Sequence, residues 1–259
     1  HYQSWLPDGE PKAVLLIVHG LGEHSGRYMN VVNHFIPLKF AIYGFDLPGH
    51  GKSGGGREQV ERIDDYTDTL TTYYEMVRSW QPAKPIFLLG HSMGGMISTY
   101  YLLDNQSKFK GAIISAAPIR VPDNINPMTV ILGKLLSTIA PKMGVIPLDP
   151  TGVSRDQKVV DAYISDPLVY HGKTPARLSA EMLKAMTRIT AEAKKITLLV
   201  RGQGAFRSSG AAKTPTGASN KERINRPEKK RSSHIRWDAL LPLRNNKSCM
   251  GILLCWQNC

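Results

Sequence analysis

The chain has 259 residues, of which 42% are hydrophobic and 21% charged, and it carries a formal net charge of +12. This length fits one α/β domain with an insertion, or two small domains, and it is long enough to bury a large core. The composition excludes a disordered chain, and no apolar run reaches the roughly 18 residues that a membrane-spanning helix needs. The sequence opens on His1 without a basic and then apolar leader, so we expect residues upstream and a location in the cytoplasm or at a membrane surface.

The positive charge is concentrated at one end of the chain. Residues 201–259 hold 12 Lys and Arg against 3 Asp and Glu, whereas residues 1–200 hold 21 against 18. The three cysteines, Cys249, Cys255 and Cys259, also lie in this tail, and three cysteines make neither a disulfide framework nor a zinc pattern. The sequence therefore reads as two different compositions joined near residue 200.

Alternation predicts a short strand at residues 2–5, and apolar segments predict strands at residues 13–18, 40–45, 86–89, 111–116 and 196–200. Between them, the spacing of 3, 4, 3, 4 and 3 residues from Ile63 to Trp80 predicts an amphipathic helix, and residues 96–104 predict another. Strands that alternate with helices indicate a doubly wound, mostly parallel sheet.

The segment before the last predicted strand is too long for a plain connection. It is rich in proline, shows no strand alternation, and carries helical stripes at residues 128–139 and 178–193. We expect an α/β core at 1–118, a helical cap at 119–190 over the carboxyl edge of the sheet, and a core strand at 191–202. An atypical basic tail, disordered or out of frame, would follow at 203–259.

One motif carries chemistry. Gly90-His91-Ser92-Met93-Gly94 matches the pattern G-x-S-x-G, and it follows a predicted strand and precedes a predicted helix. That strand–turn–helix context is the one in which a serine is exposed as a nucleophile on a strained turn. The alternative is a glycine-rich helix start with an exposed serine. We take Ser92 as the catalytic nucleophile.

A second loop follows the first central strand, at His19-Gly20-Leu21-Gly22. In enzymes with such a serine turn, this loop and the residue after the serine each give one backbone N–H to an oxyanion hole. We therefore predict that Leu21 and Met93 supply these amides. A plain strand-to-helix turn is the alternative for the loop.

Three blocks together resemble monoacylglycerol lipases and related lysophospholipases of the α/β-hydrolase fold. They are residues 20–28 (GLGEHSGRY), 46–53 (DLPGHGKS) and 90–95 (GHSMGG), and Ser165-Asp166-Pro167-Leu168 in the cap is similar too. The resemblance covers about residues 2–200. It implies a serine esterase with an Asp and a His beside Ser92, and an apolar cap that accepts a single acyl chain.

The tail departs from that family. Ala205 occupies the position where the resemblance implies the triad Asp, and His234, the only histidine after residue 200, does not match the family's base. The general acid and base thus stay unidentified. A displaced reading frame or a fusion after residue 200 would explain the break.

Other histidines offer a substitute base. His19, His24, His50 and His91 lie by topology near the active edge of the sheet, and His171 lies in the cap; a structural role is the commoner one for such residues. A pair between His234 and Asp238 has no support in the local pattern. No phosphate loop or metal-ligand cluster is visible, so we predict no cofactor.

The sequence leads to a serine ester hydrolase that cleaves monoacyl lipids through an acyl-enzyme on Ser92. Two alternatives stay open: an inactive product of the same fold, and an anion or nucleic-acid binder that acts through the basic tail around Lys229, Lys230 and Arg231. No specific nucleic acid is expected. The apolar helix at 128–139 predicts either contact with a membrane or micelle, or ordinary packing on the core.

Overall fold

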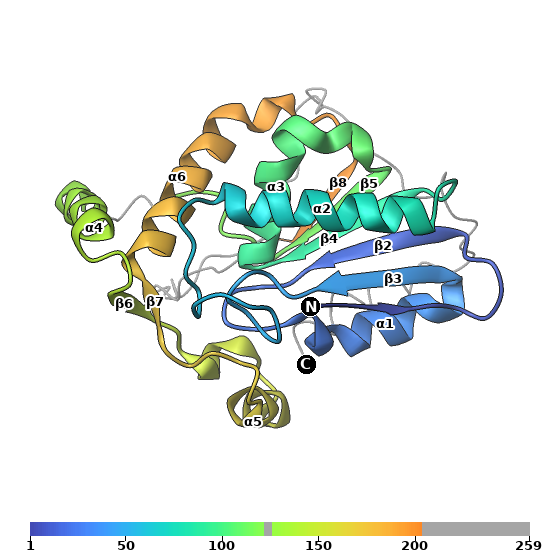
Figure 1. Cartoon of the computed structure of the whole chain (residues 1–259), viewed down its shortest axis with the longest axis horizontal. Helices are drawn as coiled ribbons and strands as arrows, with labels where there is room; N and C mark the ends of the chain where they lie inside the picture. Colours follow the sequence, from blue (N-terminus) through green and yellow to red (C-terminus); the bar gives the residue numbers. More distant parts are fainter. Residues whose placement is uncertain (122–125, 204–259) are drawn as a thin grey trace, which may run out of the picture.

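A computed structural model describes residues 1–121 and 126–203 of the chain. Its centre is a six-stranded sheet in the order β1-β3-β2-β4-β5-β8 (Figure 1). β1 is antiparallel to β3, and every other neighbouring pair is parallel. The strands are β1 (Tyr2–Trp5), β2 (Ala13–Val18), β3 (Phe40–Phe45), β4 (Ile86–His91), β5 (Gly111–Ser115) and β8 (Val200–Gln203). The predicted doubly wound, mostly parallel sheet is confirmed.

Helices cover both faces of this sheet, which explains why its central strands are apolar throughout. Leu16 on β2 packs with α2 (Asp64–Trp80), α3 (Met93–Asn105) and α6 (Ala176–Glu192) on one face. Its neighbours Leu15 and Ile17 point to the other face, where they pack with α1 (Met29–Phe35). Alternate residues of one strand thus enter two separate cores.

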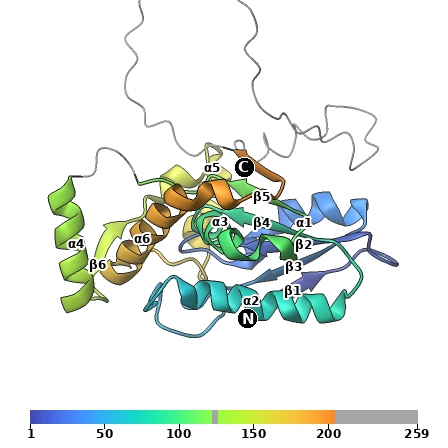
Figure 2. The ribbon, with the colours of Figure 1, turned by 90° about the horizontal axis from the view of Figure 1, so that it is seen from above.

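The segment between β5 and β8 forms the cap. It contains α4 (Pro127–Ile139), β6 (Gly144–Pro147), α5 (Gln157–Ser165) and β7 (Lys173–Pro175), and then α6, which returns to the sheet and packs on α3. Figure 2 shows α4 standing away from the sheet, beside α6. The segment was predicted as a helical cap, and it contains in addition two strands, β6 and β7, which pair as an antiparallel ribbon.

Several element bounds also differ from the prediction. The strand expected at 196–200 begins at Val200, because Thr197 N–H and Leu198 N–H donate to the Gln106 side chain instead of to a neighbouring strand. Helix α3 begins at Met93 rather than three residues later, directly after Ser92. The sequence pattern also gave no signal for α1 or α5.

The basic tail lies almost wholly outside the described residues. The predictions that concern Ala205, His234, the pair with Asp238 and the three cysteines all fall there. Within the described part, no helix is both long and apolar enough to cross a bilayer.

Candidate active site

Ser92 occupies the junction between β4 and α3. Its φ of 51° and ψ of −123° are an uncommon conformation for a residue with a side chain, as expected for a serine held on a strained turn. The turn is fixed from both sides: Ser92 N–H donates to Ser115 O at 2.9 Å, and Met96 N–H donates to Ser92 O at 3.1 Å. The side chain is half-buried at the carboxyl end of the sheet.

Two glycines make this turn possible. A Cβ on Gly94 would overlap the carbonyl oxygens of Val18 and His19, and a Cβ on Gly90 would overlap Ser98 Oγ. The backbone of the turn therefore lies directly against β2 and the first turns of α3. Any other residue at these positions would push the serine out of place.

The loop after β2 lies beside Ser92. The Cβ position of Gly20 is 3.2 Å from Ser92 Cβ. Gly20 N–H is occupied, since it donates to Glu23 Oε1 at 2.6 Å. Leu21 N–H and Met93 N–H, by contrast, have no acceptor among the described residues. The two amides predicted for an oxyanion hole therefore have no acceptor among the described residues, and they belong to the residues that directly follow Gly20 and Ser92.

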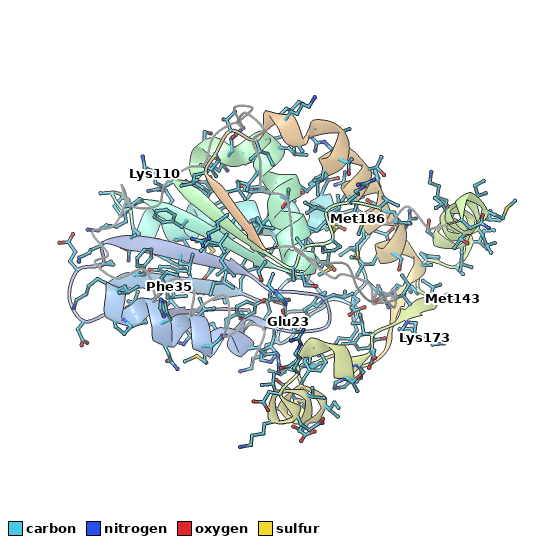
Figure 3. The ribbon with its side chains drawn as sticks, turned by 180° about the vertical axis from the view of Figure 1, so that it is seen from behind. Glu23, Phe35, Lys110, Met143, Lys173 and Met186 are labelled. Carbon is cyan, nitrogen blue, oxygen red and sulfur yellow. The ribbon has the colours of Figure 1, made fainter. Side chains whose placement is uncertain are left out.

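Glu23 holds this loop, and the sequence analysis did not single it out. Its Oε1 also accepts from the Tyr28 hydroxyl at 2.8 Å, and Arg27 Nε lies 3.7 Å from its Oε2. Figure 3 shows Glu23 at the end of the sheet that meets the cap, with Met143, which precedes β6, and Lys173 of β7 farther out. The available signal was its place three residues after Gly20, from which a carboxylate can accept a backbone N–H.

Asp46, at the end of β3, anchors the neighbouring loop. It is buried, and its two oxygens accept from Ser25 N–H at 2.8 Å, Ser25 Oγ at 2.6 Å and Lys52 N–H at 2.9 Å. Burial opposes ionisation of this carboxyl, but these hydrogen bonds prevail and lower its pKa.

His19 is a structural residue in this arrangement. Leu47 N–H donates to its Nε2 at 2.9 Å, so the proton is on Nδ1, which donates to Gly20 O at 2.8 Å. Burial lowers the pKa of the imidazole, which favours the same neutral form. Both ring nitrogens are thus committed to the backbone.

His24 and His50 are also held by neighbours. Gly26 N–H donates to His24 Nδ1 at 3.2 Å, and His24 Nε2–H donates to Asp166 Oδ2 in the cap at 2.9 Å. His50 Nδ1 donates to Pro48 O at 3.0 Å, and burial lowers the pKa of His50 to about 3. Neither ring bonds to Ser92.

The other two histidines considered as a substitute base, His91 and His171, also have partners other than Ser92. His91 Nδ1 lies 3.4 Å from Ser115 Oγ, and the exposed His171 packs edge-on against Tyr163. Among the described residues, no histidine forms a hydrogen bond with Ser92 Oγ. The described part of the chain holds a serine turn and two free amides, without a base in place.

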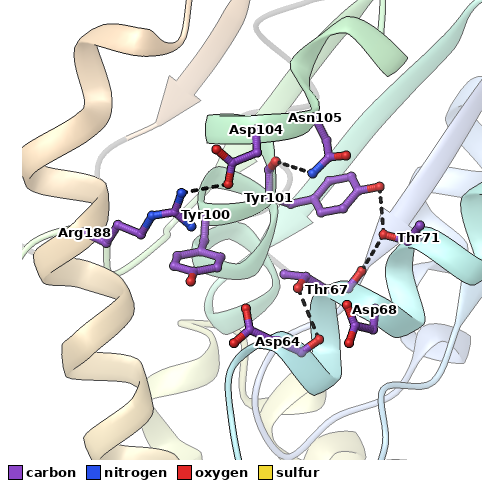
Figure 4. Close-up of a pocket in the computed structure, with 9 residues that line it drawn as sticks. All are labelled: Asp64, Thr67, Asp68, Thr71, Tyr100, Tyr101, Asp104, Asn105 and Arg188. Atoms are coloured by element: carbon purple, nitrogen blue, oxygen red, sulfur yellow. Dashed lines mark hydrogen bonds and ion pairs between the residues drawn. The ribbon is translucent and has the colours of Figure 1, made fainter.

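A polar pocket elsewhere on the molecule is separate from this site. Figure 4 shows it between α2, α3 and α6, with Arg188 Nη2 2.7 Å from Asp104 Oδ2. Asp104 follows Ser92 by a helical rise of about 18 Å. The charged and hydroxyl groups that line this pocket are largely paired with one another, as expected where helices pack together. Among the residues that the structure describes, no group of three His, Cys, Asp or Glu could hold a metal ion.

Comparison with known proteins fits this geometry. Residues 9–203 match the Hydrolase_4 family, described as serine aminopeptidase, S33. A monoacylglycerol lipase of Mycolicibacterium smegmatis is 35% identical over 182 residues, which are 70% of this chain and 65% of that protein. A monoglyceride lipase homolog of monkeypox virus is 36% identical over 201 residues, which cover 76% of this chain and 72% of that protein.

The chain belongs to the monoacylglycerol lipase family of the α/β-hydrolase fold. A solved structure agrees: the monoacylglycerol lipase of Paleococcus ferrophilus superposes with a TM-score of 0.68 at 30% identity, over 78% of this chain and 76% of that one. The chain thus spans about two thirds to three quarters of the length of these relatives. The resemblance stated from the sequence is confirmed, and so is the fold class.

Proposed function

We propose that the protein is a serine ester hydrolase that cleaves monoacylglycerol-like lipids through an acyl-enzyme on Ser92. The observation that carries the proposal is the conformation of Ser92, which lies on a strained turn next to the loop of Gly20, while the amides of Leu21 and Met93 have no acceptor among the described residues. The relatives named as monoacylglycerol lipases support the substrate class.

In the first step, Ser92 Oγ attacks the ester carbonyl carbon, and the carbonyl oxygen becomes an oxyanion. Leu21 N–H and Met93 N–H donate to this oxyanion, and the N-terminus of α3 favours the developing negative charge. Collapse of the intermediate releases the glycerol-type alcohol and leaves the acyl group on Ser92. Water then attacks the acyl-enzyme, releases the fatty acid and restores the serine.

The proton of Ser92 needs an acceptor during the attack, because a serine hydroxyl is a weak nucleophile at its own pKa. The same group must then protonate the leaving alcohol. No histidine among the described residues forms a hydrogen bond with Ser92 Oγ, so we propose that the base lies outside them. Glu23 accepts from Gly20 N–H and from the Tyr28 hydroxyl and pairs with Arg27, and these contacts fix the loop that carries Leu21.

The test is hydrolysis of a medium-chain p-nitrophenyl ester by the whole chain, with Ser92→Ala as the blank. We expect the variant to lose at least about 10³-fold in kcat with unchanged folding. A matched control is Ser115→Ala, which keeps the backbone carbonyl that accepts from Ser92 N–H and is expected to retain activity. Equal rates in the chain and in Ser92→Ala would contradict the proposal.

That last result would support a second function, an inactive member of the same fold. The specific observation in its favour is the absence of a base beside Ser92 among the described residues. An inactive fold would still unfold cooperatively and would retain a fatty acid or monoacyl lipid. Equilibrium binding of a fluorescent fatty acid to the unchanged chain and to Ser92→Ala distinguishes an inactive folded protein from an unfolded one.

We also propose that the cap contacts a lipid surface through α4. Five of its apolar side chains are between 54 and 73% exposed: Met128, Ile131, Leu132, Leu135 and Ile139. The helix carries a single charged residue, Lys134. An apolar helix face of this size, standing away from the core, suits the boundary of a bilayer from which a monoacyl lipid could enter.

Partitioning onto phosphatidylcholine vesicles tests this contact. The double variant Leu132→Glu/Leu135→Glu should bind more weakly, by about tenfold for each leucine, because each loses the free energy of apolar burial. Thr138→Glu places the same charge on an exposed position of α4 and should bind within about twofold of the unchanged chain. Equal loss in both variants would mean that charge, not the apolar face, controls binding.

A further inference from the structure

Glu58 is the most unusual buried group outside the serine turn. It lies in the loop between β3 and α2, and none of its surface is exposed. Its φ of 54° is in the left-handed region, which is uncommon for a glutamate. Neither carboxylate oxygen has a hydrogen-bond partner among the described residues. A buried carboxyl in a strained backbone and without a partner suggests a role beyond packing.

Three elements meet at this carboxyl. Glu58 Oε1 is 3.4 Å from the Cβ position of Gly22, in the loop that carries Leu21. Thr174 of β7 approaches it from the cap; its buried hydroxyl makes no hydrogen bond of good geometry, yet it is close enough to lower the pKa of Glu58. The Tyr66 hydroxyl, from α2, is a third buried and unpartnered group in the region. Glu58 thus lies where the oxyanion loop, the cap and the core helix come together.

The cap rests directly on the same loop. Tyr170 N–H donates to Gly22 O at 2.8 Å, and Tyr170 O and Leu148 lie 3.1 and 3.3 Å from the Cβ position of Gly22. Gly22 has a φ of +71°, so its conformation also depends on the lack of a side chain. A shift of the cap against Gly22 would therefore be transmitted to Leu21 N–H, one residue away.

The protonation state of Glu58 depends on its burial. Burial raises its pKa to about 7, and the Thr174 hydroxyl opposes that rise. The titratable groups that feel its charge are Tyr66 and Tyr163, whose own pKa values it raises, and no cation of the described residues offsets it. Apart from the Thr174 hydroxyl, no described group offsets the charge of the ionised form, whereas the neutral acid places no charge in this buried region.

We propose that Glu58 is a positioning residue that, as a neutral carboxylic acid, holds the oxyanion loop against the cap, and that its ionised form releases this contact. The consequence for catalysis rests on the proposed function, because it concerns the placement of Leu21 N–H. The contact itself does not, since the hydrogen bond from Tyr170 to Gly22 exists whether or not the protein turns over an ester. The two parts can therefore be tested apart.

The test is amide hydrogen exchange of peptides that contain Tyr170, between pH 6 and 8.5, corrected for the intrinsic rate. In the unchanged chain, we expect the protection factor to fall at least about tenfold across this range, because one pKa unit corresponds to a factor of ten. In Glu58→Gln, which keeps the shape but cannot ionise, protection should stay constant. Glu75→Gln removes an exposed carboxylate on α2 and should behave like the unchanged chain.

Thr174→Val provides an independent variant. The hydroxyl opposes the rise in the Glu58 pKa, so its removal should move the loss of protection to higher pH. If Glu58→Gln does not fold, as judged by near-ultraviolet circular dichroism, this shift carries the test. Constant protection in the unchanged chain, equal pH dependence in Glu58→Gln, or a shift to lower pH in Thr174→Val would each overturn the proposal.

The catalytic part has its own readout. If Ser92-dependent hydrolysis is observed, kcat should fall above pH 7 in the unchanged chain and less in Glu58→Gln, with little change in KM. Absent turnover would count against the proposed function and would leave the exchange result to decide the role of Glu58.

Discussion

The serine turn and the cap helix α4 are built in opposite ways. At the turn, the backbone of α3 touches that of β2 so closely that Gly94 has no room for a methyl group. On α4, the space around Gly133 is open, and large apolar side chains face outward. One region is determined by contacts within the chain, whereas the other packs on α6 and exposes most of its apolar surface.

This difference separates two kinds of constraint. The turn is fixed by sterics and backbone hydrogen bonds, so small changes there should act on the whole fold. Helix α4 is constrained mainly by helix propensity and by whatever surface it meets. Changes there should affect binding or local order more than global stability.

The largest effect should come from Gly94→Ala. A Cβ at this position overlaps two carbonyl oxygens of the central sheet, which cannot move without disrupting β2. We expect a loss of about 3 kcal/mol or more in the free energy of unfolding, measured by urea titration. Gly54→Ala, whose Cβ would meet nothing within 4 Å, is the control and should change it by less than about 0.5 kcal/mol. A stable Gly94→Ala protein would contradict the close contact between Gly94 and the carbonyl oxygens of Val18 and His19.

Asp46→Asn should have an intermediate effect that depends on pH. The amide keeps one acceptor for Ser25 but places N–H groups against Lys52 N–H, so we expect a loss of about 2 kcal/mol at pH 7. Because the folded pKa of Asp46 is lowered, its contribution is present above the unfolded value of 3.8 and is lost as the pH falls through the folded value. Urea titrations at pH 7 and pH 3 should therefore show a smaller difference between the two proteins at pH 3.

The smallest effect should come from Gly133→Ala on α4. Alanine has a higher helix propensity than glycine and meets no neighbour here, so we expect α4 to gain about 0.5–1 kcal/mol. Hydrogen exchange of peptides within Pro127–Ile139 measures this gain even if α4 opens separately from the core. Weaker protection in the variant would show that another surface packs closely against this glycine.

Much of the core could be predicted from the sequence, because its strands are apolar on both faces. The bounds of β2 and β3 agree with the prediction, and of the six apolar residues from Ile63 to Trp80 that predicted α2, all but the exposed Trp80 are buried. The strained turn at Ser92 was also predictable, since a glycine-flanked serine between a strand and a helix has few other conformations.

The rest depended on tertiary contacts that no local pattern contains. The β6–β7 ribbon has no alternating pattern and forms because the cap returns beside itself. Glu58 looks in the sequence like one more charged loop residue, and only the approach of Thr174 and Gly22 shows that it is buried. The structural roles of His19 and His24 likewise depend on partners far along the chain, Leu47 and Asp166.

The hydrogen bonds of His19 have a consequence for the proton balance of unfolding. The folded chain holds this ring neutral, because Leu47 N–H needs a lone pair on Nε2, whereas the unfolded ring titrates near pH 6.5. His50 and His91 are shifted in the same direction by burial. Between their folded pKa values and pH 6.5, these three histidines bind more protons in the unfolded chain, so they take up protons on unfolding; Glu58, whose folded pKa is raised, acts in the opposite direction. The heat of unfolding measured near pH 6 should accordingly depend on the ionisation enthalpy of the buffer that supplies those protons.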